Sequence, residues 1–337
     1  MLKDCPTQIA LNARFRRAKR LSGVQNWSAH VADALNSLEG IVVNEYIPHP
    51  FFATGIRGHL WEQVVLPLKA RKSNILLSPG NSGPIFSPKQ LVCVHDAMVF
   101  THPKFFTKSY RAISKILLKS YSPRRTRILT VSNSSMEAIR QVVSSEMVIT
   151  VVGVGLPHME FGLFEQSNED YFLFIGGDIE RKNLNFLLAF WGHIYETTRY
   201  KLVVVVGKNS SSLRTTPLHK MDGVKYILEP DNLALSILYQ GSRALLWPSM
   251  AEGFGIPLLE AMSFGRPFVS TPVGAANELR TGESVVLPPD KLLWQNQIIK
   301  MVLNPQNDSA EQIKKTYEYT WDEVSYRIKK EIAFFLN

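Results

Sequence analysis

The sequence predicts an α/β protein with two doubly wound parallel sheets, one in each half of the chain. Short apolar runs of strand length alternate with helical stretches along the whole chain, and such alternation is typical of parallel strands joined by right-handed crossovers. The 337 residues suit two domains of roughly 150 residues better than one. A composition of 45% hydrophobic and 20% charged residues excludes a disordered or fibrous protein.

The first half contains six strand candidates, each of which is followed by a loop or a helical stretch. The strands are expected within residues 8–13, 41–46, 74–78, 90–96, 127–132 and 147–152. Helical spacing of apolar residues predicts helices over 26–38, 57–69, 104–120 and 132–141. The helix at 132–141 begins with Ser and Asn, which are preferred residues for a helix N-cap.

The second half repeats this alternation after an acidic segment, residues 161–170, which we interpret as the linker between the domains. Strands are expected within 171–177, 201–207, 225–228, 243–249, 267–271 and 284–289. Helices are expected within 183–194, 233–242 and 257–264, and two or three more follow at the C-terminal end. Ligands of such sheets bind at the carboxyl ends of the strands, so we expect a cleft there.

The positive charge is concentrated in the first half. Residues 1–155 hold 20 Lys and Arg against 8 Asp and Glu, a net charge of +12, whereas residues 156–337 have a net charge of −3. The first half is therefore expected to face an acidic membrane, a phosphorylated substrate or nucleic acid, unless the charge serves solubility alone. No apolar run reaches the roughly 18 residues that span a bilayer, and residues 1–17 lack an apolar signal core, which favours a cytoplasmic protein.

The strongest local signal is the segment SMAEGFGIPLLEAMSFGRPFVSTPVGAANEL, residues 249–279. A strand ends near Pro248, a loop with Gly253 and Gly255 follows, and a helix begins near Pro257. Glycines let a backbone approach a ligand closely, and a helix N-terminus suits phosphate or hydroxyl oxygens. The carboxylates of Glu252 and Glu260 can accept hydrogen bonds from sugar hydroxyls, although Glu260 could instead complement the helix dipole.

A second signal is FIGGDIERKNLNFLLAF, residues 174–190. A strand ends at two glycines, and Arg181 and Lys182 stand just before a helix that begins near Asn183. Two cations beside free backbone N–H groups are typical of a diphosphate site. A solvated basic pair is the alternative, but cations at a helix N-terminus oppose the helix dipole, which weakens that alternative. Together the two segments offer cations and hydroxyl acceptors, which are the two features that a nucleotide diphosphate sugar requires.

These segments resemble the motifs of retaining GT-B glycosyltransferases of family 4, the type that builds bacterial surface polysaccharides such as lipopolysaccharide. The two glutamates of EGFGIPLLE, the preceding LYQGSRALLWPS and the following PFVSTPVGAANEL are specific as a set, and IGGDIERKNL resembles the phosphate-binding segment. In the first half, LSGVQNWSAHVADAL, LWEQVVLP, LLSPGNSGPI, VHDAMVFTHPKFF and LTVSNSSMEAI follow the family layout. The resemblance therefore covers nearly the whole chain.

The resemblance implies two Rossmann-like domains that face a central cleft. Residues 1–158 would form the acceptor-binding domain and residues 159–318 the domain that binds the nucleotide sugar. Residues 319–337 would form a helix that packs back on the first domain. The implied activity is the retaining transfer of a hexose from a GDP- or UDP-linked donor to a glycan or a lipid-linked acceptor.

The resemblance also implies roles for individual residues. Glu260 would bind the ribose hydroxyls of the donor, and Glu252 would contact the transferred sugar near its anomeric carbon. Lys182, with Arg181, would neutralise the diphosphate leaving group. The remaining donor contacts would come from the backbone at Gly23, Leu228, Gly253, Phe254, Gly255, Ile256 and Pro257.

On the acceptor side, the resemblance places His95 beside the reacting centre, with Asp96 orienting it or capping the next segment. A histidine at a strand end is also a common structural residue, so both readings of His95 stay open. Two departures from the family pattern are visible. Gly177 stands where many relatives have an arginine, and Asn26 and Trp27 replace an Arg-Tyr pair, which leaves the acceptor contact unassigned.

Three expectations follow for the chemistry. Because no Asp-x-Asp pair is visible and Arg181 and Lys182 can stabilise the leaving group, we expect no metal and no other cofactor. No carboxylate is clearly placed as a nucleophile, which favours attack on the leaving-group face with help from the donor phosphate. The basic first domain predicts peripheral contact with the anionic inner membrane.

Two other classes of protein compete with this interpretation. An enzyme of the same architecture could be a sugar-nucleotide epimerase or a phosphorylase, although the cofactor-lysine signature of a phosphorylase is absent. A pI of 9.4 also suits a protein that binds nucleic acid, but the basic stretches lie on separate elements and no known nucleic-acid module is recognisable.

Overall fold

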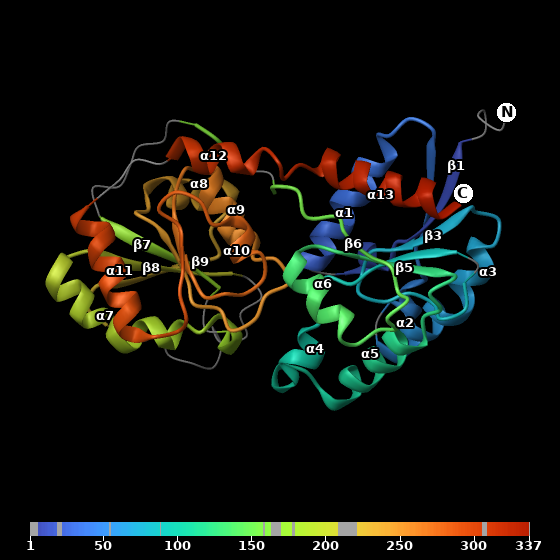
Figure 1. Cartoon of the computed structure of the whole chain (residues 1–337), viewed down its shortest axis with the longest axis horizontal. Helices are drawn as coiled ribbons and strands as arrows, with labels where there is room; N and C mark the ends of the chain where they lie inside the picture. Colours follow the sequence, from blue (N-terminus) through green and yellow to red (C-terminus); the bar gives the residue numbers. More distant parts are fainter. Residues whose placement is uncertain are drawn as a thin grey trace. The chain divides into compact units, whose positions relative to one another are not determined.

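The computed structural model describes residues 6–18, 22–53, 55–87, 89–157, 159–162, 170–176, 179–207, 221–304 and 309–336. The chain divides into two compact units, of which unit 1 contains residues 1–155 and 319–337 and unit 2 contains residues 156–318 (Figure 1). Each unit has a six-stranded parallel sheet with helices around it, so the predicted α/β class with two doubly wound sheets is confirmed.

The sheet of unit 1 has the order β2-β1-β3-β4-β5-β6, and all of its paired strands are parallel. Its strands are β1 (Thr7–Asn12), β2 (Ile41–Tyr46), β3 (Ile75–Ser78), β4 (Gln90–Cys93), β5 (Thr126–Thr130) and β6 (Ile149–Val151). The central strands are buried, which explains why their sequences are continuous apolar runs without alternation.

The helices of unit 1 are α1 (Gly23–Asn36), α2 (Gly55–Leu60), α3 (Leu66–Ala70), α4 (Met98–Thr101), α5 (Lys108–Ser120), α6 (Asn133–Arg140) and α13 (Trp321–Leu336). Between α2 and α3 the helix continues through a π-helical turn, Trp61–Val65. α5 and α6 cover β4, β5 and β6 through buried residues such as Leu117, Leu118 and Ile139. Short 3-10 turns at Arg14–Arg17, Pro50–Phe52 and Pro103–Phe105 complete the loops.

The last helix, α13, returns to unit 1 and packs against α1. The ring of Trp321 stacks on His30 with centroids 4.5 Å apart, and Arg127 pairs with Glu331 at 2.9 Å. The backbone of Gly155 lies so close to Trp321 that a side chain there would overlap the indole ring. The chain passes from unit 1 to unit 2 after Gly155, three residues before the boundary at residue 158 that the resemblance implied. The predicted linker, residues 161–170, belongs to unit 2, and residues 163–169 of it lie outside the described residues.

The sheet of unit 2 has the order β12-β11-β10-β7-β8-β9 and is also parallel throughout. Its strands are β7 (Tyr171–Ile175), β8 (Lys201–Val206), β9 (Val224–Leu228), β10 (Leu245–Trp247), β11 (Phe268–Ser270) and β12 (Val285–Val286). Its helices are α7 (Leu184–Thr198), α8 (Asn232–Gly241), α9 (Ile256–Ser263), α10 (Ala276–Leu279), α11 (Lys291–Leu303) and α12 (Ser309–Thr316).

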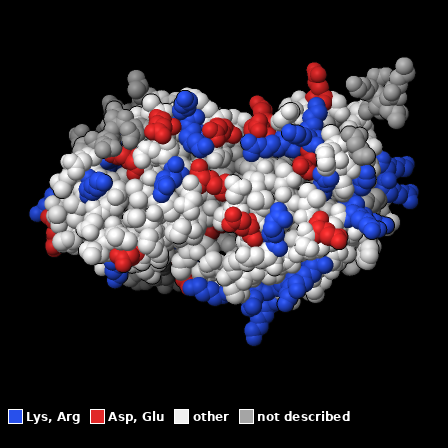
Figure 2. All heavy atoms as spheres, viewed as in Figure 1, with Lys and Arg blue, Asp and Glu red and all other residues white. Residues whose placement is uncertain are grey.

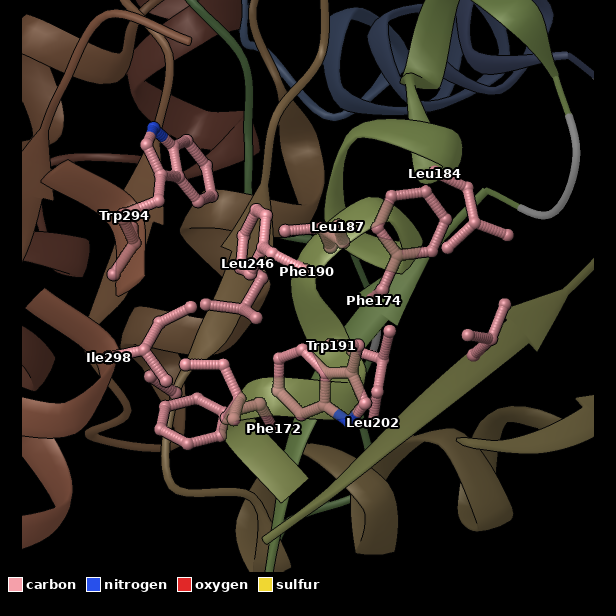
Figure 3. Close-up of a cluster of buried hydrophobic side chains, with 14 of the residues drawn as sticks. Phe172, Phe174, Leu184, Leu187, Phe190, Trp191, Leu202, Leu246, Trp294 and Ile298 are labelled. Carbon is pink, nitrogen blue, oxygen red and sulfur yellow. The ribbon is translucent and has the colours of Figure 1, made fainter. Parts of the chain in front are cut away.

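The core of unit 2 lies where α7 and α11 pack against the central strands (Figure 3). The ring of Phe172 meets Trp191 of α7 edge-on, with centroids 6.1 Å apart. Phe174 lies beside Leu184 of α7, and Trp294 and Ile298 approach from α11. These side chains are almost fully buried and hold the two central strands, β7 and β10, in place. Because β7 pairs with β10, the loops that follow these strands emerge side by side.

Candidate active site

The described part of the loop after β7, residues 179–183, carries two cations, Arg181 and Lys182. Gly176 adopts φ +141°, and its backbone lies so close to Lys182 that a Cβ there would come 2.8 Å from Cγ of the lysine. A 3-10 turn, Glu180–Lys182, follows, and Asn183 then takes a left-handed conformation with φ 60°. Nδ2 of Asn183 donates to the carbonyl of Pro248 at 3.2 Å, so this strained residue is held by the neighbouring loop.

The loop after β10 is tied to the loop after β7 by several hydrogen bonds. The amide of Met250 donates to the carbonyl of Arg181 at 2.8 Å, and Oγ of Ser249 donates to the same carbonyl at 3.1 Å. The guanidinium of Arg181 in turn donates to the carbonyl of Ala251. The loops after β7 and β10, which the sequence marked as two separate segments, are therefore held together by hydrogen bonds at the carboxyl edge of the sheet.

Glu252 is the centre of a buried charge cluster. Its Oε1 lies 2.8 Å from Nζ of Lys182, 2.8 Å from NH1 of Arg181 and 2.6 Å from Oγ of Ser249. The ammonium of Lys182 also lies 4.0 Å from the ring centroid of Trp247, which is a cation–π distance. Arg181, Lys182 and Glu252 by themselves carry a net charge of +1.

Burial and charge act in opposite directions on these groups. Burial is the largest influence on Lys182 and lowers the pKa of its ammonium, although the charge of Glu252 raises it in part. Burial alone would raise the pKa of Glu252, but Lys182 and Arg181 outweigh it, and the pKa of this carboxyl is lowered. Glu252 is therefore held as a carboxylate by its two cationic neighbours.

Glu260 has a different environment, on helix α9. Its carboxyl accepts a hydrogen bond from the hydroxyl of Tyr239, a fully buried residue of α8. Burial raises the pKa of Glu260, and the hydrogen bond from Tyr239 and the charge of Lys182 offset only part of this rise. Glu252 and Glu260 thus have opposite pKa shifts within one site, as expected for carboxyls with different tasks.

The glycine loop before α9 is shaped by close backbone contacts. Gly255 takes φ +96° as the residue before the helix, and Pro257 stands in the first turn, as predicted. The carbonyl of Phe254 accepts a hydrogen bond from the amide of Ala275 at 2.8 Å, and a Cβ at Gly274 would overlap that same carbonyl. The backbone of Gly253, Phe254, Gly255 and Ile256 is thereby fixed at the N-terminus of α9.

Among the described residues, Nε1 of Trp247 is buried without a hydrogen-bond partner. It lies 3.6 Å from the position that a Cβ would take at Gly255. Leu228, the predicted contact to the base, ends the edge strand β9 and is half exposed at the same carboxyl edge. Within the parts of the chain that the structure describes, no group of three or more His, Cys, Asp or Glu side chains could hold a metal.

Two of the predicted residues of unit 1, His95 and Asp96, lie in the loop after β4. His95 follows β4 and is buried; its Nε2 lies 2.9 Å from the carbonyl of Pro79, and its ring contacts Trp27 edge-on. Burial lowers the pKa of His95 to about 4, so the imidazole is neutral at pH 7. Since the Pro79 carbonyl can only accept, Nε2 carries the proton and Nδ1 keeps its lone pair.

Asp96 and Gly23 have simpler surroundings. Oδ1 of Asp96 accepts a hydrogen bond from the amide of Met98 at 2.9 Å, which caps the start of α4. Gly23 is the first residue of α1, and no described atom lies within 4 Å of the position that its Cβ would take. Gly177, which replaces an arginine of many relatives, lies outside the described residues.

The structure thus brings Arg181, Lys182 and Glu252 into direct contact, with Glu260 close enough to shift the pKa of the lysine. Sequence reasoning missed Trp247, Ser249, Tyr239, Asn183 and Gly274 as parts of this site. Trp247 and Ser249 stand in the WPS segment next to the glycine loop, which was the available signal for them. The sequence carried no comparable signal for Tyr239, because its contact with Glu260 depends on how α8 packs beside α9.

Comparisons with known proteins agree with this arrangement. Residues 169–304 match the family described as Glycosyl transferases group 1, a range that contains both loops and α9. The O-antigen chain mannosyltransferase RfbU of Salmonella typhimurium is 30% identical over 219 residues, which cover 62% of this chain and 60% of that protein. The chain therefore aligns with about three fifths of the length of this curated relative.

Solved structures show the same fold over nearly the whole chain. Sucrose-phosphate synthase from Thermosynechococcus elongatus matches with a TM-score of 0.73 at 16% identity, covering 97% of this chain and 98% of that chain. HepE from Anabaena, solved in complex with UDP-glucose, matches with a TM-score of 0.67 at 13% identity and covers 97% of this chain and 99% of that chain. These likenesses establish that the chain has the GT-B fold.

Proposed function

We infer that this chain, a GT-B protein whose second unit carries a glycosyl transferases group 1 domain, is a glycosyltransferase that uses a nucleotide diphosphate sugar as donor. The observation that supports this most directly is the buried cluster of Arg181, Lys182 and Glu252 beside the N-terminus of α9. Its net positive charge and the helix dipole favour a diphosphate, and the two carboxyls offer acceptors for sugar hydroxyls.

For the donor, we propose a GDP- or UDP-linked hexose that spans the carboxyl edge of unit 2. Lys182 and Arg181 would hold the diphosphate, and the fixed backbone from Gly253 to Pro257 would hold the hexose and the nearer phosphate. Glu260 would accept hydrogen bonds from the ribose hydroxyls. Leu228 would lie against the base, and Gly23 would approach the phosphates from unit 1.

We propose a retaining mechanism without a metal or another cofactor. As the bond from the anomeric carbon to the phosphate oxygen breaks, negative charge grows on the leaving diphosphate, where Lys182 and Arg181 stabilise it. The acceptor hydroxyl attacks from the same face and gives its proton to that phosphate oxygen. Glu252 is held as a carboxylate between its cations, so it can orient the sugar without attacking it. Detection of a covalent glycosyl-enzyme by mass spectrometry would overturn this mechanism.

His95 is proposed to act on the acceptor side as a neutral group. Its proton is engaged at Nε2 by the carbonyl of Pro79, so Nδ1 is the nitrogen that can accept a hydrogen bond. With a pKa of about 4 the ring is a poor general acid at pH 7. Asp96 would act indirectly, since it fixes the start of α4 directly after the histidine.

The acceptor is proposed to be a glycan or lipid-linked sugar of surface polysaccharide synthesis, since RfbU is described as acting on the O-antigen chain. Lys and Arg side chains gather over the part of unit 1 where α4 and α5 lie (Figure 2). On α5 and just beyond it, the exposed cations are Lys108, Arg111, Lys115, Lys119, Arg124 and Arg125. This surface suits peripheral contact with anionic lipid at the inner membrane.

An apolar stripe on the α2–α3 helix strengthens the membrane proposal. Ile56, Leu60, Val64 and Leu68 follow one another at four-residue spacing, and each is more than half exposed. Exposed apolar rows of this length on a helix are typical of interaction surfaces, and Lys69 lies beside the last of them. No helix among the described residues is long and apolar enough to cross a bilayer.

A panel of nucleotide sugars tests the function. UDP-glucose, UDP-galactose, GDP-mannose and the free nucleotides are titrated against the full chain, with thermal shift and calorimetry as readouts. We expect one donor class to raise the melting temperature and oligonucleotides to leave it unchanged. A shift with oligonucleotides alone would favour the nucleic-acid alternative. Conversion of the nucleotide sugar to its epimer, detected by NMR in the absence of an acceptor, would favour an epimerase.

A further inference from the structure

Trp247 is the last residue of β10, a central strand of the sheet in unit 2. Its backbone carbonyl accepts a hydrogen bond at 3.2 Å from the amide of Thr271, just beyond the neighbouring strand β11. A side chain that starts from a central strand is held more precisely than one on a loop. The side chain of Trp247 is 1% exposed, so the indole can influence a ligand only through the residues that cover it.

The residue that covers the indole face is Lys182. Its Nζ lies 4.0 Å from the ring centroid of Trp247, well within the range of a cation–π interaction. The stem of the lysine has little freedom, because a Cβ at Gly176 would come 2.8 Å from Cγ of Lys182. The backbone of Gly176 thus restricts the stem, and the indole of Trp247 faces the charged end.

The charges around Lys182 leave its ammonium in need of a second favourable contact. Oε1 of Glu252 lies 2.8 Å from Nζ of Lys182, but it lies equally close to NH1 of Arg181. Burial has the largest effect and lowers the pKa of the Lys182 ammonium, whereas the charge of Glu252 raises it. Arg181 lowers this pKa further, and Glu260 raises it in part. The negative face of an aromatic ring acts in the same direction as the two carboxylates, so Trp247 stabilises the charged form.

The indole nitrogen shows that packing alone does not explain a tryptophan at this position. Among the described residues, Nε1 of Trp247 is buried and has no hydrogen-bond partner. A buried N–H group without a partner destabilises the folded state, and a phenylalanine ring would fill the strand end without that group. Tryptophan, however, attracts a cation more strongly than the other aromatic side chains. The cation above the ring therefore accounts for the indole better than packing does.

We propose that Trp247 is a positioning residue of the donor site, whose indole face keeps the ammonium of Lys182 charged and in place for the diphosphate. The inference rests on the proposed function in one respect, because the diphosphate belongs to the proposed donor. Trp247 does not touch the donor; it acts through Lys182. Weakening the negative charge of the ring should therefore weaken diphosphate binding even when the shape of the ring is kept.

Fluorinated tryptophans at position 247 test this proposal, because ring fluorines withdraw electron density from the face and change its shape little. Analogues with increasing numbers of fluorines are introduced into the full chain by codon suppression, and calorimetry gives the Kd for UDP and for GDP. We expect the Kd of the nucleotide that the wild type binds to rise stepwise, by about tenfold across the series. The matched control places the same analogues at Trp191, a buried tryptophan whose Nε1 donates to the carbonyl of Gly223, and should leave the Kd unchanged.

Competitive labelling with acetic anhydride measures the charge of Lys182 without any nucleotide. The full chain is labelled over a range of pH, and mass spectrometry of the peptide that contains Lys182 gives the pH of half-maximal labelling. Trp247→Leu keeps an apolar side chain but removes the aromatic face, so this pH should fall by about one unit, and Trp247→Phe should restore most of it. The fluorinated chains are labelled in the same way and should show a graded fall, which decides the outcome even if Trp247→Leu does not fold.

The two measurements separate this inference from the proposed function. A Kd that does not change with the number of fluorines, or wild-type labelling of Lys182 in the fluorinated chains, would overturn the role of Trp247. If the labelling shifts as expected but the wild type binds neither UDP nor GDP, the proposed function is refuted and the support of Lys182 by Trp247 is confirmed.

Discussion

The replacement Lys182→Met tests the charge cluster most directly, because it removes one cation and keeps the length of the side chain. In the wild type, Nζ lies 2.8 Å from Oε1 of Glu252 and is largely buried. Breaking a buried ion pair usually costs about 3–5 kcal/mol, but Arg181 at 2.8 Å and Ser249 at 2.6 Å still satisfy the carboxylate. We therefore expect the free energy of unfolding to fall by only about 1–2 kcal/mol.

The effect on the donor should be larger than the effect on folding. A charge-assisted hydrogen bond to a diphosphate contributes about 1.5–3 kcal/mol, so the Kd for the nucleotide sugar should rise by roughly 10- to 100-fold. Turnover should fall by about 10²–10³-fold, because leaving-group charge grows in the transition state and loses one of its two cations. Because the proposed mechanism uses no metal, added Mg²⁺ should not rescue this loss.

Isothermal titration with the donor from the nucleotide-sugar panel gives the Kd, and urea unfolding gives the stability. Lys300→Met is the matched control, because it removes the same charge from the exposed face of α11 in the same unit. Lys182→Arg keeps a cation and should retain part of the affinity. If folded Lys182→Met binds the donor within twofold of the wild type, the assignment of the diphosphate to this cluster is refuted.

Three further outcomes are expected. Gly274→Ala forces a side chain onto the Phe254 carbonyl at a φ of +55°, so it should cost about 1–3 kcal/mol of stability in thermal melts and weaken donor binding, whereas Gly207→Ala, with no described atom near its Cβ, should do neither. Since the pKa of His95 is lowered to about 4 by burial, the unfolded state binds its proton first as the pH falls, and stability should drop by about 3 kcal/mol from pH 6.5 to pH 4. Urea titrations of His95→Gln should lack this part of the pH dependence. Vesicles rich in phosphatidylserine should bind the chain at low salt and release it steeply as salt rises, and Lys115→Glu should weaken that binding; salt-independent binding in a sedimentation assay would contradict the electrostatic part of the membrane proposal.

The fold could be predicted because each element is marked locally. The continuous apolar run of residues 202–206 predicts a buried parallel strand, and β8, Lys201–Val206, is that strand. Pro257 just after Gly255 predicts the start of a helix, and α9 begins there. Such signals lie within a few residues of one another and do not depend on how distant segments pack.

The composition of the candidate site depends on long-range pairing, and here the sequence was insufficient. Arg181 and Glu252 stood out as separate signals, but their contact exists because β7 pairs with β10 in the sheet. Tyr239 occupies a position in α8 that the helical pattern marks as buried and apolar. Only the packing of α8 beside α9 brings its hydroxyl to Glu260.

The return of α13 to unit 1 has a consequence for biosynthesis. A ribosome delivers residues 1–155 first, yet the surface of α1 that receives Trp321 must wait until all of unit 2 has been translated. Residues 156–318 are continuous in sequence and can fold as soon as they emerge. Unit 1 is thus the last unit to be completed. A stop codon shortly before residue 319 would leave unit 2 whole and deprive unit 1 of its last helix.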